Sequence, residues 1–518
     1  MGRRVKKHGV FINVLDPQKY LLGLDAGNTV IKAVLFDLQG NELAKHALDG
    51  QSSTPQPGHV ERDLDELWEN AVEVIKACVE KAEISPKSIV GIGCAGHGNG
   101  LYLLDQAGNS LLGIQSLDTR AADVAEDLSS NDHANEFHAI CLQKPWPSQT
   151  PTLLAWVKKF QPEVYKNTGT VLLCKDFITY KLTGEKVSDV SDMSGCGLLR
   201  MSDCSYDAQL MSLYGLGDAI DLLPRLIQPD DVAGFVSHEV AEQTGLVMGT
   251  PVVGGLFDVV ASALGSGAAK PGQASVIAGT WSINQVLSTA PVNDQSVFMV
   301  SCFGDNRYVN IEASATSAAN LEWYVRELVE RGRHHDDPFG FCNDLIAAIE
   351  PAADDPFFHP YLYGSGQGAQ MRAGFYGIAG WHTEGHMLRA LFEGVVFEHR
   401  RHIEQLTSAG VDFGDAILSG GGSRSPIWPQ IFADCLGKRM KVAVCEETGA
   451  LGAAIAAGTG AGEFSDLEAG VAAMTSTRTI FSPNPAMESH YDGRYKMFTE
   501  LANAMSSFWE KQHNYKDG

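Results

Sequence analysis

Residues 251–267 read PVVGGLFDVVASALGSG, and the organisation of the chain can be worked out from them. An apolar run comes first, Gly254 and Gly255 interrupt it, and Asp258 precedes a run of small apolar residues. This pattern predicts a strand, a tight turn and a helix that begins at Asp258. An aspartate there can cap the first free N–H groups of the helix. Beside two glycines that admit a ligand, the same carboxylate can act as a general base.

The length, composition and net charge of the chain indicate a multidomain globular protein. With 518 residues the chain is too long for one core, so we expect at least two domains. Its 44% hydrophobic and 20% charged residues are typical of a soluble protein. The formal net charge of −24 argues against a general nucleic-acid or anionic-membrane binder. A phosphate substrate stays compatible, because backbone N–H groups and a metal ion can neutralise it.

The chain shows no targeting or membrane signal. The apolar stretch near its start is too short for a signal peptide, and no run of about 18 apolar residues follows. The ten cysteines form no CxxC pair and lie mostly in apolar runs. This usage predicts reduced, buried thiols in a cytoplasmic protein.

Two stretches share one pattern of strand, turn and strand. Residues 20–37 have a turn at residues 26–28, and residues 274–288 have a turn at Gly279-Thr280. The repeat predicts two domains of like architecture. Apolar periodicity adds helices, which we place at Leu64–Lys81, 382–406, Trp428–Leu436 and 446–460.

Two glycine-rich segments have alternative interpretations. Residues 91–96, GIGCAG, match a dinucleotide fingerprint, but HGNGLYLLD follows instead of the helix that this fingerprint needs. We therefore reject a dinucleotide fold; the segment is a ligand loop lined by His97 and Asn99, or a hairpin turn. Residues 416–425, AILSGGGSRS, are either a backbone cradle for an anion or flat ring, or a structural turn. Asp118 and Arg120 follow a predicted strand, where a polar ligand site and a salt bridge are both open.

Four motifs together resemble one family. They are LGLDAGNTVIKAVLFD (22–37), GGLFDVVASALGSG (254–267), WHTEGHMLRALFEGVVFEH (381–399), and SGGGSRSPIWPQIFADCLG (419–437) with GALGAAIAAG (449–458) behind it. In this order they resemble the FGGY sugar kinases of the actin and hexokinase-like superfamily, over about residues 20–490. AGHGNGLYLLD, VVGGLFDVV, AGTW and EASATSAANLEW are most similar to the L-xylulose kinase branch and related pentulose and polyol kinases.

The resemblance implies an α/β fold of two ribonuclease H-like domains, each a mixed five-stranded sheet with helices, around a catalytic cleft. It implies an N-terminal extension at residues 1–18 and a sugar- and phosphate-binding domain at 19–255. A nucleotide-binding domain would occupy 256–490, and a C-terminal helix or tail 491–518.

The resemblance also implies roles for matching positions. Asp258 would be the general base, and Asp25 would hold Mg²⁺ through water. The ATP- and phosphate-binding residues would be Gly27, Asn28, Thr29, Gly279, Thr280, Gly377, Gly421, Gly422 and Ser423. The substrate-binding residues would be His97, Gly98, Asn99, Asp118 and Arg120, together with Asp258.

These roles predict a carbohydrate kinase that uses Mg-ATP to phosphorylate a hydroxyl of a small ketose or polyol, with L-xylulose as the first choice. D-Xylulose, ribulose, erythritol and glycerol are alternatives. Asn28 stands where the family usually has Thr or Gly, and His97 and Asn99 stand where the L-xylulose branch has Gln and Lys. These departures leave the sugar open, because epimers are distinguished by hydrogen bonds to single hydroxyls.

The rival class is a non-enzymatic sugar-binding regulator on the same fold. Such a protein would lose the base or carry a DNA-binding helix-turn-helix, whereas this chain keeps Asp25 and Asp258, and its first 18 residues are too few for such a domain. We expect a small-molecule substrate, no nucleic-acid or membrane partner, a homodimer or homotetramer, and a cytoplasmic location.

Overall fold

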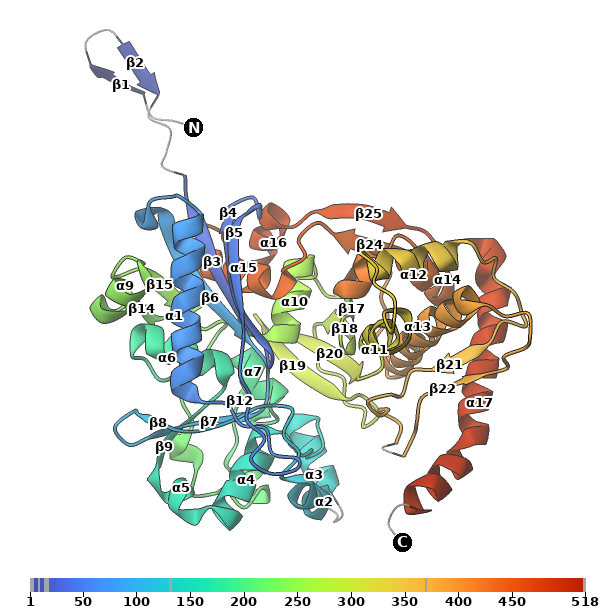
Figure 1. Ribbon diagram of the computed structural model, residues 1–518. Coiled ribbons are helices and arrows are strands. Elements are labelled where there is room, and N and C mark those ends of the chain that lie inside the picture. The colour runs from blue at the N-terminus through green and yellow to red at the C-terminus, as the bar shows by residue number, and fades with distance from the viewer. Residues whose placement is uncertain (1–3, 8–9, 14–17, 130–132, 369, 516–518) are drawn as a thin grey trace. The chain divides into compact units, whose positions relative to one another are not determined.

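The computed structural model describes residues 4–7, 10–13, 18–129, 133–368 and 370–515 (Figure 1). Its contacts divide the chain into two compact units. The first unit comprises Met1–Gly265, Ser301–Asp305 and Glu447–Thr475; the second comprises Ser266–Val300, Asn306–Glu446 and Ser476–Gly518. The predicted domains were continuous and met after residue 255, whereas these units alternate along the sequence. The helix predicted at residues 446–460 thus belongs almost entirely to the first unit.

The first unit is built on one mixed sheet of seven strands in the order β14-β15-β6-β3-β4-β5, with β16 also paired to β6. Their bounds are β3 (Tyr20–Ala26), β4 (Val30–Asp37), β5 (Glu42–Asp49), β6 (Ile89–Gly96), β14 (Val232–Phe235), β15 (Pro251–Val253) and β16 (Leu256–Phe257). The predicted five-stranded sheet is present as the core, β15-β6-β3-β4-β5, and two short strands extend it.

Smaller elements complete the first unit. β7 (Leu101–Asp105), β8 (Ser110–Ile114) and β9 (Thr168–Leu172) form a three-stranded sheet, while β10 (Val187–Asp189) pairs with β13 (Arg225–Ile227) and β11 (Leu199–Arg200) with β12 (Ser205–Tyr206). The helices are α1 (Leu64–Lys81), α2 (Ala122–Ser129), α3 (His133–Cys141), α4 (Thr150–Phe160), α5 (Pro162–Asn167), α6 (Cys174–Thr183), α7 (Val190–Gly195), α8 (Ala208–Leu213), α9 (His238–Thr244), α10 (Asp258–Ser266), α15 (Thr448–Gly460) and α16 (Leu467–Met474). At the N-terminus β1 (Arg4–Lys7) and β2 (Val10–Asn13) form an antiparallel pair.

The two faces of β3 and β6 carry different residues. Leu22 and Leu24 of β3 lie in the apolar cluster with the buried face of α1, which crosses the sheet in Figure 1. Because side chains alternate along a strand, Gly23 and Gly93 lie on the other face. A Cβ atom on Gly23 would lie 1.9 Å from the carbonyl oxygen of Ala450, and one on Gly93 would lie 2.0 Å from that of Ala453. Gly23 of β3 and Gly93 of the GIGCAG segment therefore admit the backbone of α15.

The second unit is built on a sheet of seven strands in the order β19-β20-β18-β17-β23-β24-β25; most of its edge strand β19, residues 301–304, is assigned to the first unit. Their bounds are β17 (Ala274–Ala278), β18 (Ser282–Ser288), β19 (Met299–Gly304), β20 (Arg307–Ser314), β23 (Ala416–Ser419), β24 (Met440–Ala443) and β25 (Thr477–Phe481). Here too a core of five strands is extended, by β19 and β25 at the edges. The helices are α11 (Ala319–Tyr324), α12 (Pro338–Ala347), α13 (Glu384–Ser408), α14 (Trp428–Leu436) and α17 (Glu488–Tyr515), and β21 (Phe357–His359) pairs with β22 (Gly374–Tyr376).

The cysteines differ from the prediction at one pair. Cys204 and Cys302, 98 residues apart in the sequence, form a disulfide in the first unit. The expectation of reduced thiols is wrong for these two, because a separation of this length carries no signal that the fold brings them together. Seven other cysteines are free and buried: Cys78, Cys94, Cys141, Cys174, Cys196, Cys342 and Cys435. In the described part of the chain, no helix is long and apolar enough to cross a membrane.

Candidate active site

Asp258 lies where β16 ends and α10 begins, as the sequence predicted. Gly255, two residues before β16 ends, has φ +77, and a Cβ atom on it would lie 2.0 Å from the carbonyl oxygen of Cys94. Asp258 is half-buried. Burial, and then the negative charge of Asp25, raise the pKa of Asp258 to about 8, while the amide of Val259 hydrogen-bonds it. The carboxylate thus accepts an amide at the start of α10, and its burial near a second carboxylate makes it a candidate acid–base group.

Asp25 occupies the end of β3 and pairs with a lysine that the sequence analysis missed. The Nζ atom of Lys32 lies 3.4 Å from Oδ2 of Asp25 and 2.8 Å from Oε2 of Glu447. Burial raises the pKa of Asp25, and the Lys32 ammonium opposes that rise. Asp25 and Lys32 are direct cross-strand neighbours in the predicted hairpin, so their pairing had a signal in the sequence. Glu447 had none, because it comes from just before α15.

The turn after β3 is held by side chains from elsewhere in the first unit. Asn28 donates from Nδ2 to Oγ of Ser116 at 2.9 Å, and Gln115 donates to the carbonyl oxygen of Asn28 at 2.7 Å. Arg62 donates from Nη1 to the carbonyl oxygen of Gly27 at 3.2 Å. Thr29 is exposed at the tip of the turn. The predicted phosphate residues thus lie in a braced turn beside Asp25.

The predicted sugar loop lies against the strand that carries Asp258. A Cβ atom on Gly98 would lie 2.4 Å from the ring of Phe257, so the loop and the residue before Asp258 are in contact. His97 is buried, its Nε2 lies 2.8 Å from the hydroxyl of Tyr102, and burial lowers its pKa to about 4. Asn99, with φ +61, is buried, and its Oδ1 accepts no hydrogen bond from the described residues.

Asp118 and Arg120 form the salt bridge that was one of their two predicted alternatives. Arg120 Nε lies 3.0 and 2.9 Å from the two carboxylate oxygens of Asp118, and Arg120 Nη2 lies 2.8 Å from Oε1 of Glu61. Asp118 also accepts the amide of Val60 at 2.6 Å. Nη1 of Arg120 has no hydrogen-bond partner in the described part of the chain.

In the second unit, the predicted turn Gly279-Thr280 joins β17 to β18, and a buried histidine pair lies behind it. The amide of Ala318 donates to the carbonyl oxygen of Gly279 at 2.8 Å. From α13, His399 Nδ1 lies 2.9 Å from Oδ1 of Asn284, and His402 Nδ1 lies 3.0 Å from Nδ2 of the same amide. The amide orientation assigns the proton to Nδ1 of His399 and leaves Nδ1 of His402 as an acceptor. Both rings are neutral, because burial lowers the pKa of His399 to about 3 and that of His402 well below its ordinary value.

Because these two histidines are buried and neutral, we expect the stability of the protein to depend on pH. We expect His399→Asn to make that dependence weaker. Folded His399 stays neutral while the unfolded chain binds a proton, so its contribution is present above pH about 6.5 and is lost as the pH falls toward about 3. Between pH 7.5 and 5.5 the loss is about 1.4 kcal/mol for this histidine. Urea unfolding at the two pH values should show a shallower dependence for the variant by that amount.

Other titrating groups contribute equally to the wild type and to His399→Asn, so comparing the two proteins removes their effect. One such group is Glu312, whose pKa burial raises to about 7 and which acts in the opposite direction. His238→Asn is the control, because the side chain of His238 is 75% exposed. Equal pH dependence in the wild type and His399→Asn would contradict the prediction.

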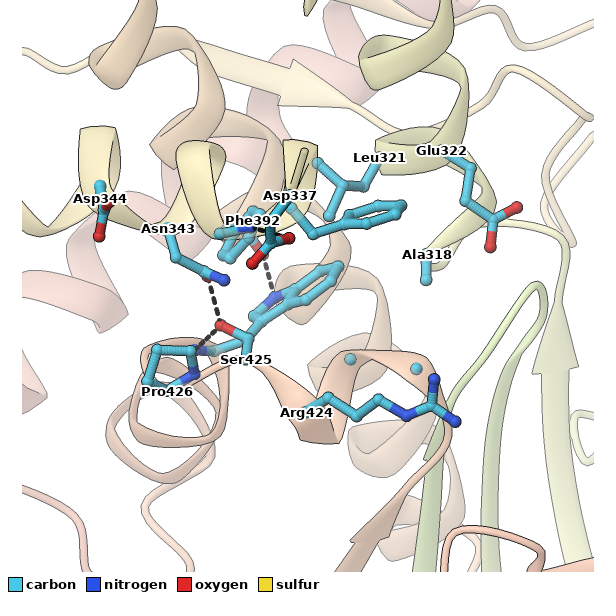
Figure 2. Close-up of a pocket in the computed structure, with 15 residues that line it drawn as sticks. Ala318, Leu321, Glu322, Asp337, Asn343, Asp344, Phe392, Arg424, Ser425 and Pro426 are labelled. Atoms are coloured by element: carbon cyan, nitrogen blue, oxygen red, sulfur yellow. Dashed lines mark hydrogen bonds between the residues drawn. The ribbon is translucent and has the colours of Figure 1, made fainter. Parts of the chain in front are cut away.

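A cavity of about 560 Å³ lies in the second unit beside Gly421 and Gly422 (Figure 2). Apolar walls come from Leu321, Phe339, Phe392 and Trp428, and polar groups from Glu322, Asp337, Asn343, Asp344 and Arg424. Figure 2 shows Asn343 directed at Ser425, whose hydroxyl donates to it at 2.7 Å. Aromatic and aliphatic walls combined with several polar groups suit a heteroaromatic ligand that carries hydrogen-bonding atoms.

Two residues predicted for the nucleotide are not among those that line this cavity. Ser423 turns its hydroxyl to the carbonyl oxygen of Gly420 at 2.7 Å, and Gly377 follows β22. The polar and aromatic lining residues from α11, α12 and α13 were missed, because they come from three separate helices with no shared motif.

The first unit therefore contains a carboxylate site, and the second contains a cavity of about 560 Å³ with aromatic and polar walls. Residues 20–265 match the N-terminal domain of the FGGY family of carbohydrate kinases, and residues 274–461 match its C-terminal domain. The chain therefore belongs to this family and is a carbohydrate kinase, as predicted.

Named relatives indicate which branch of the family the chain is similar to. The chain is 35% identical to a probable L-xylulose kinase of Pasteurella multocida (strain Pm70), over 94% of this chain and 99% of that one. It is 34% identical to an L-xylulose/3-keto-L-gulonate kinase of Escherichia coli (strain K12), over 95% and 98%. A crystal structure of xylulose kinase from Rhodospirillum rubrum aligns with a TM-score of 0.86 at 28% identity, covering 95% of this chain and all of that one. The predicted similarity to L-xylulose kinases is confirmed.

Proposed function

We propose that this carbohydrate kinase transfers the γ-phosphoryl group of Mg-ATP to a hydroxyl of a small ketose or polyol, with L-xylulose as the first candidate. The observation that carries the proposal is the half-buried carboxylate of Asp258, in the same unit as Asp25 and beside the loop of His97–Asn99. The relatives named L-xylulose kinase support the choice of sugar.

Asp258 would accept the proton of the attacking hydroxyl. Phosphoryl transfer needs positioning, charge neutralisation and the removal of one proton, so a single base beside a sugar loop is sufficient acid–base machinery. Neutral His97 would donate a hydrogen bond to a sugar hydroxyl or accept one from it. The unpartnered Oδ1 of Asn99 would accept a hydrogen bond from a sugar hydroxyl. Nη1 of Arg120 is a further donor for the sugar, while Asp118 supports it.

The carboxylates present suit Mg²⁺. Magnesium retains several waters and is commonly bound by one or two carboxylates together with substrate phosphates. Asp25 and Asp258 are two such carboxylates, and the described residues contain no group of three or more His, Cys, Asp or Glu side chains that could hold a metal. We propose that Asp25 holds the ion through water. When bound, the ion would supply neutralisation of phosphate charge.

The remaining parts would bind the nucleotide. Gly27, Asn28 and Thr29 in the first unit and Gly279 and Thr280 in the second would approach the phosphates. Gly421 and Gly422 would place the adenine in the cavity of the second unit, with Ser423 and Gly377 near the ribose.

The test is an ADP-release assay over a panel of C4–C6 ketoses and polyols with Mg-ATP. We expect turnover with one pentulose, L-xylulose, well above the background ATP hydrolysis. If turnover is higher with D-xylulose, ribulose, erythritol or glycerol, the proposed reaction is supported and the proposed substrate is replaced by that compound. Sugar binding by calorimetry without any turnover would instead establish the sugar-binding regulator. The predicted dimer or tetramer is tested by the mass in solution.

A further inference from the structure

Behind Asp258, the first unit contains a cluster of charged side chains with no contact to solvent. The ammonium of Lys175, from α6, lies 2.9 Å from Oδ1 of Asp189 and 3.8 Å from Oδ2 of Asp192, and it also donates to Asp176. The side chains are 0 to 1% exposed. Asp189 and Asp192 come from residues 189–197, DVSDMSGCG.

The cluster forms hydrogen bonds to both ends of the segment from Gly254 to Phe257, which precedes Asp258. Lys175 Nζ donates to the carbonyl oxygen of Gly254 at 3.3 Å. The amide of Phe257 donates to the hydroxyl oxygen of Ser191 at 3.1 Å, and the amide of Ser191 donates to Asp189 at 2.7 Å. The segment from Gly254 to Phe257 is therefore anchored at both ends to Lys175, directly at one end and through Asp189 at the other.

This anchoring has a reason in the backbone. Gly254-Gly255 gives the turn conformational freedom that any other pair of residues would restrict. The amides of Gly254 and Gly255 donate to the carbonyl oxygens of Asp231 and Pro229, and Lys175 and Ser191 add side-chain restraints on the same segment. A buried ion pair adds little net stability over apolar packing, so we take fixing the local geometry as its role. A displacement of about 1 Å at a reacting group can lower a rate by about a hundredfold.

We propose that Lys175 and Ser191 are positioning residues for Asp258: they fix the Gly254–Phe257 segment so that the carboxylate meets the sugar hydroxyl. The inference rests on the proposed role of Asp258 as the base. Neither residue touches substrate, and both act through the backbone of this segment.

The first test compares Ser191→Ala with Ser191→Thr. Alanine removes the acceptor of the Phe257 amide, and threonine keeps a hydroxyl in the same place. We expect alanine to lower kcat about tenfold, with the KM values for sugar and ATP within about twofold, and threonine to restore kcat to within about threefold. Because kcat is expressed per site that binds nucleotide in calorimetry, a loss of folded protein alone would leave it unchanged.

Ser188→Ala is the matched control. Ser188, in β10, is as completely buried as Ser191, and its Oγ has no hydrogen-bond partner among the described residues. It should keep the wild-type kcat. Lys175→Met should lower kcat further than Ser191→Ala, and it should also lower the thermal midpoint because it leaves Asp176 and Asp189 unpaired.

A crystal structure of Ser191→Ala provides a readout that does not depend on turnover. We expect the Gly254–Asp258 segment to be shifted or to have raised B-factors relative to the wild type. An unchanged segment, or an unchanged kcat per binding site, overturns the positioning role. If wild-type protein shows no turnover on any sugar, the proposed function fails, and the crystal comparison still decides whether the cluster fixes the segment.

Discussion

Asp258→Asn is expected to lower kcat at least about a hundredfold while leaving nucleotide binding nearly normal. Asparagine keeps the shape of the side chain and can still accept a hydrogen bond at the start of α10, so the fold should be preserved. It cannot take the proton of the sugar hydroxyl. The measurement is steady-state ADP release with the sugar identified by the panel, together with calorimetric titration of ATP.

Asp63→Asn is the control for this prediction. Asp63 is a pure capping residue, which accepts the amides of Asp65 and Glu66 at the start of α1. Both variants weaken a helix cap to a similar degree, but only Asp258 lies beside the sugar loop. Wild-type turnover in Asp258→Asn would show that the capping role of Asp258 is its whole role.

Gly93→Ala is expected to destabilise the first unit by about 3 kcal/mol or more. Its Cβ atom would lie 2.0 Å from the carbonyl oxygen of Ala453, and a backbone oxygen inside a helix cannot rotate away. The helix or the sheet would have to shift to relieve the clash. Urea unfolding, followed by circular dichroism, measures the change.

Gly493→Ala is the opposite case and the control. Gly493 is inside α17, and a Cβ atom there would meet nothing within 4 Å. Because alanine favours helix, this variant should gain about 0.5–1 kcal/mol. A Gly93→Ala protein as stable as the wild type would show that α15 and β6 can separate without cost, contrary to the tight packing described.

Local patterns were sufficient to predict the central elements. The apolar stripe of α1 and the strand-to-helix transition before α14 led to the observed bounds, Leu64–Lys81 and Trp428–Leu436. The hairpin of β3 and β4 followed from turn residues between two apolar runs. These signals are carried by residues that are close in sequence. The order of the four motifs along the chain then indicated the family.

Relationships between distant segments could not be predicted in this way. The short strands β14, β16, β19 and β25 have too few residues for a periodic signal. Glu447 reaches Lys32, and Ser191 reaches Phe257, only after the chain has folded. Polar residues 189–197 resemble a loop by composition, because serine and aspartate favour turns, while the structure buries them behind Asp258.

The position of α15 has a consequence for how the protein is made. The helix that covers the glycine face of β3 and β6 consists of residues 448–460, so a ribosome produces the sheet long before its cover. Until then, that apolar face is bare in the nascent chain. A chain that stops at residue 446 would contain every motif of the first unit up to Asp258, yet it would lack the segment that closes its core.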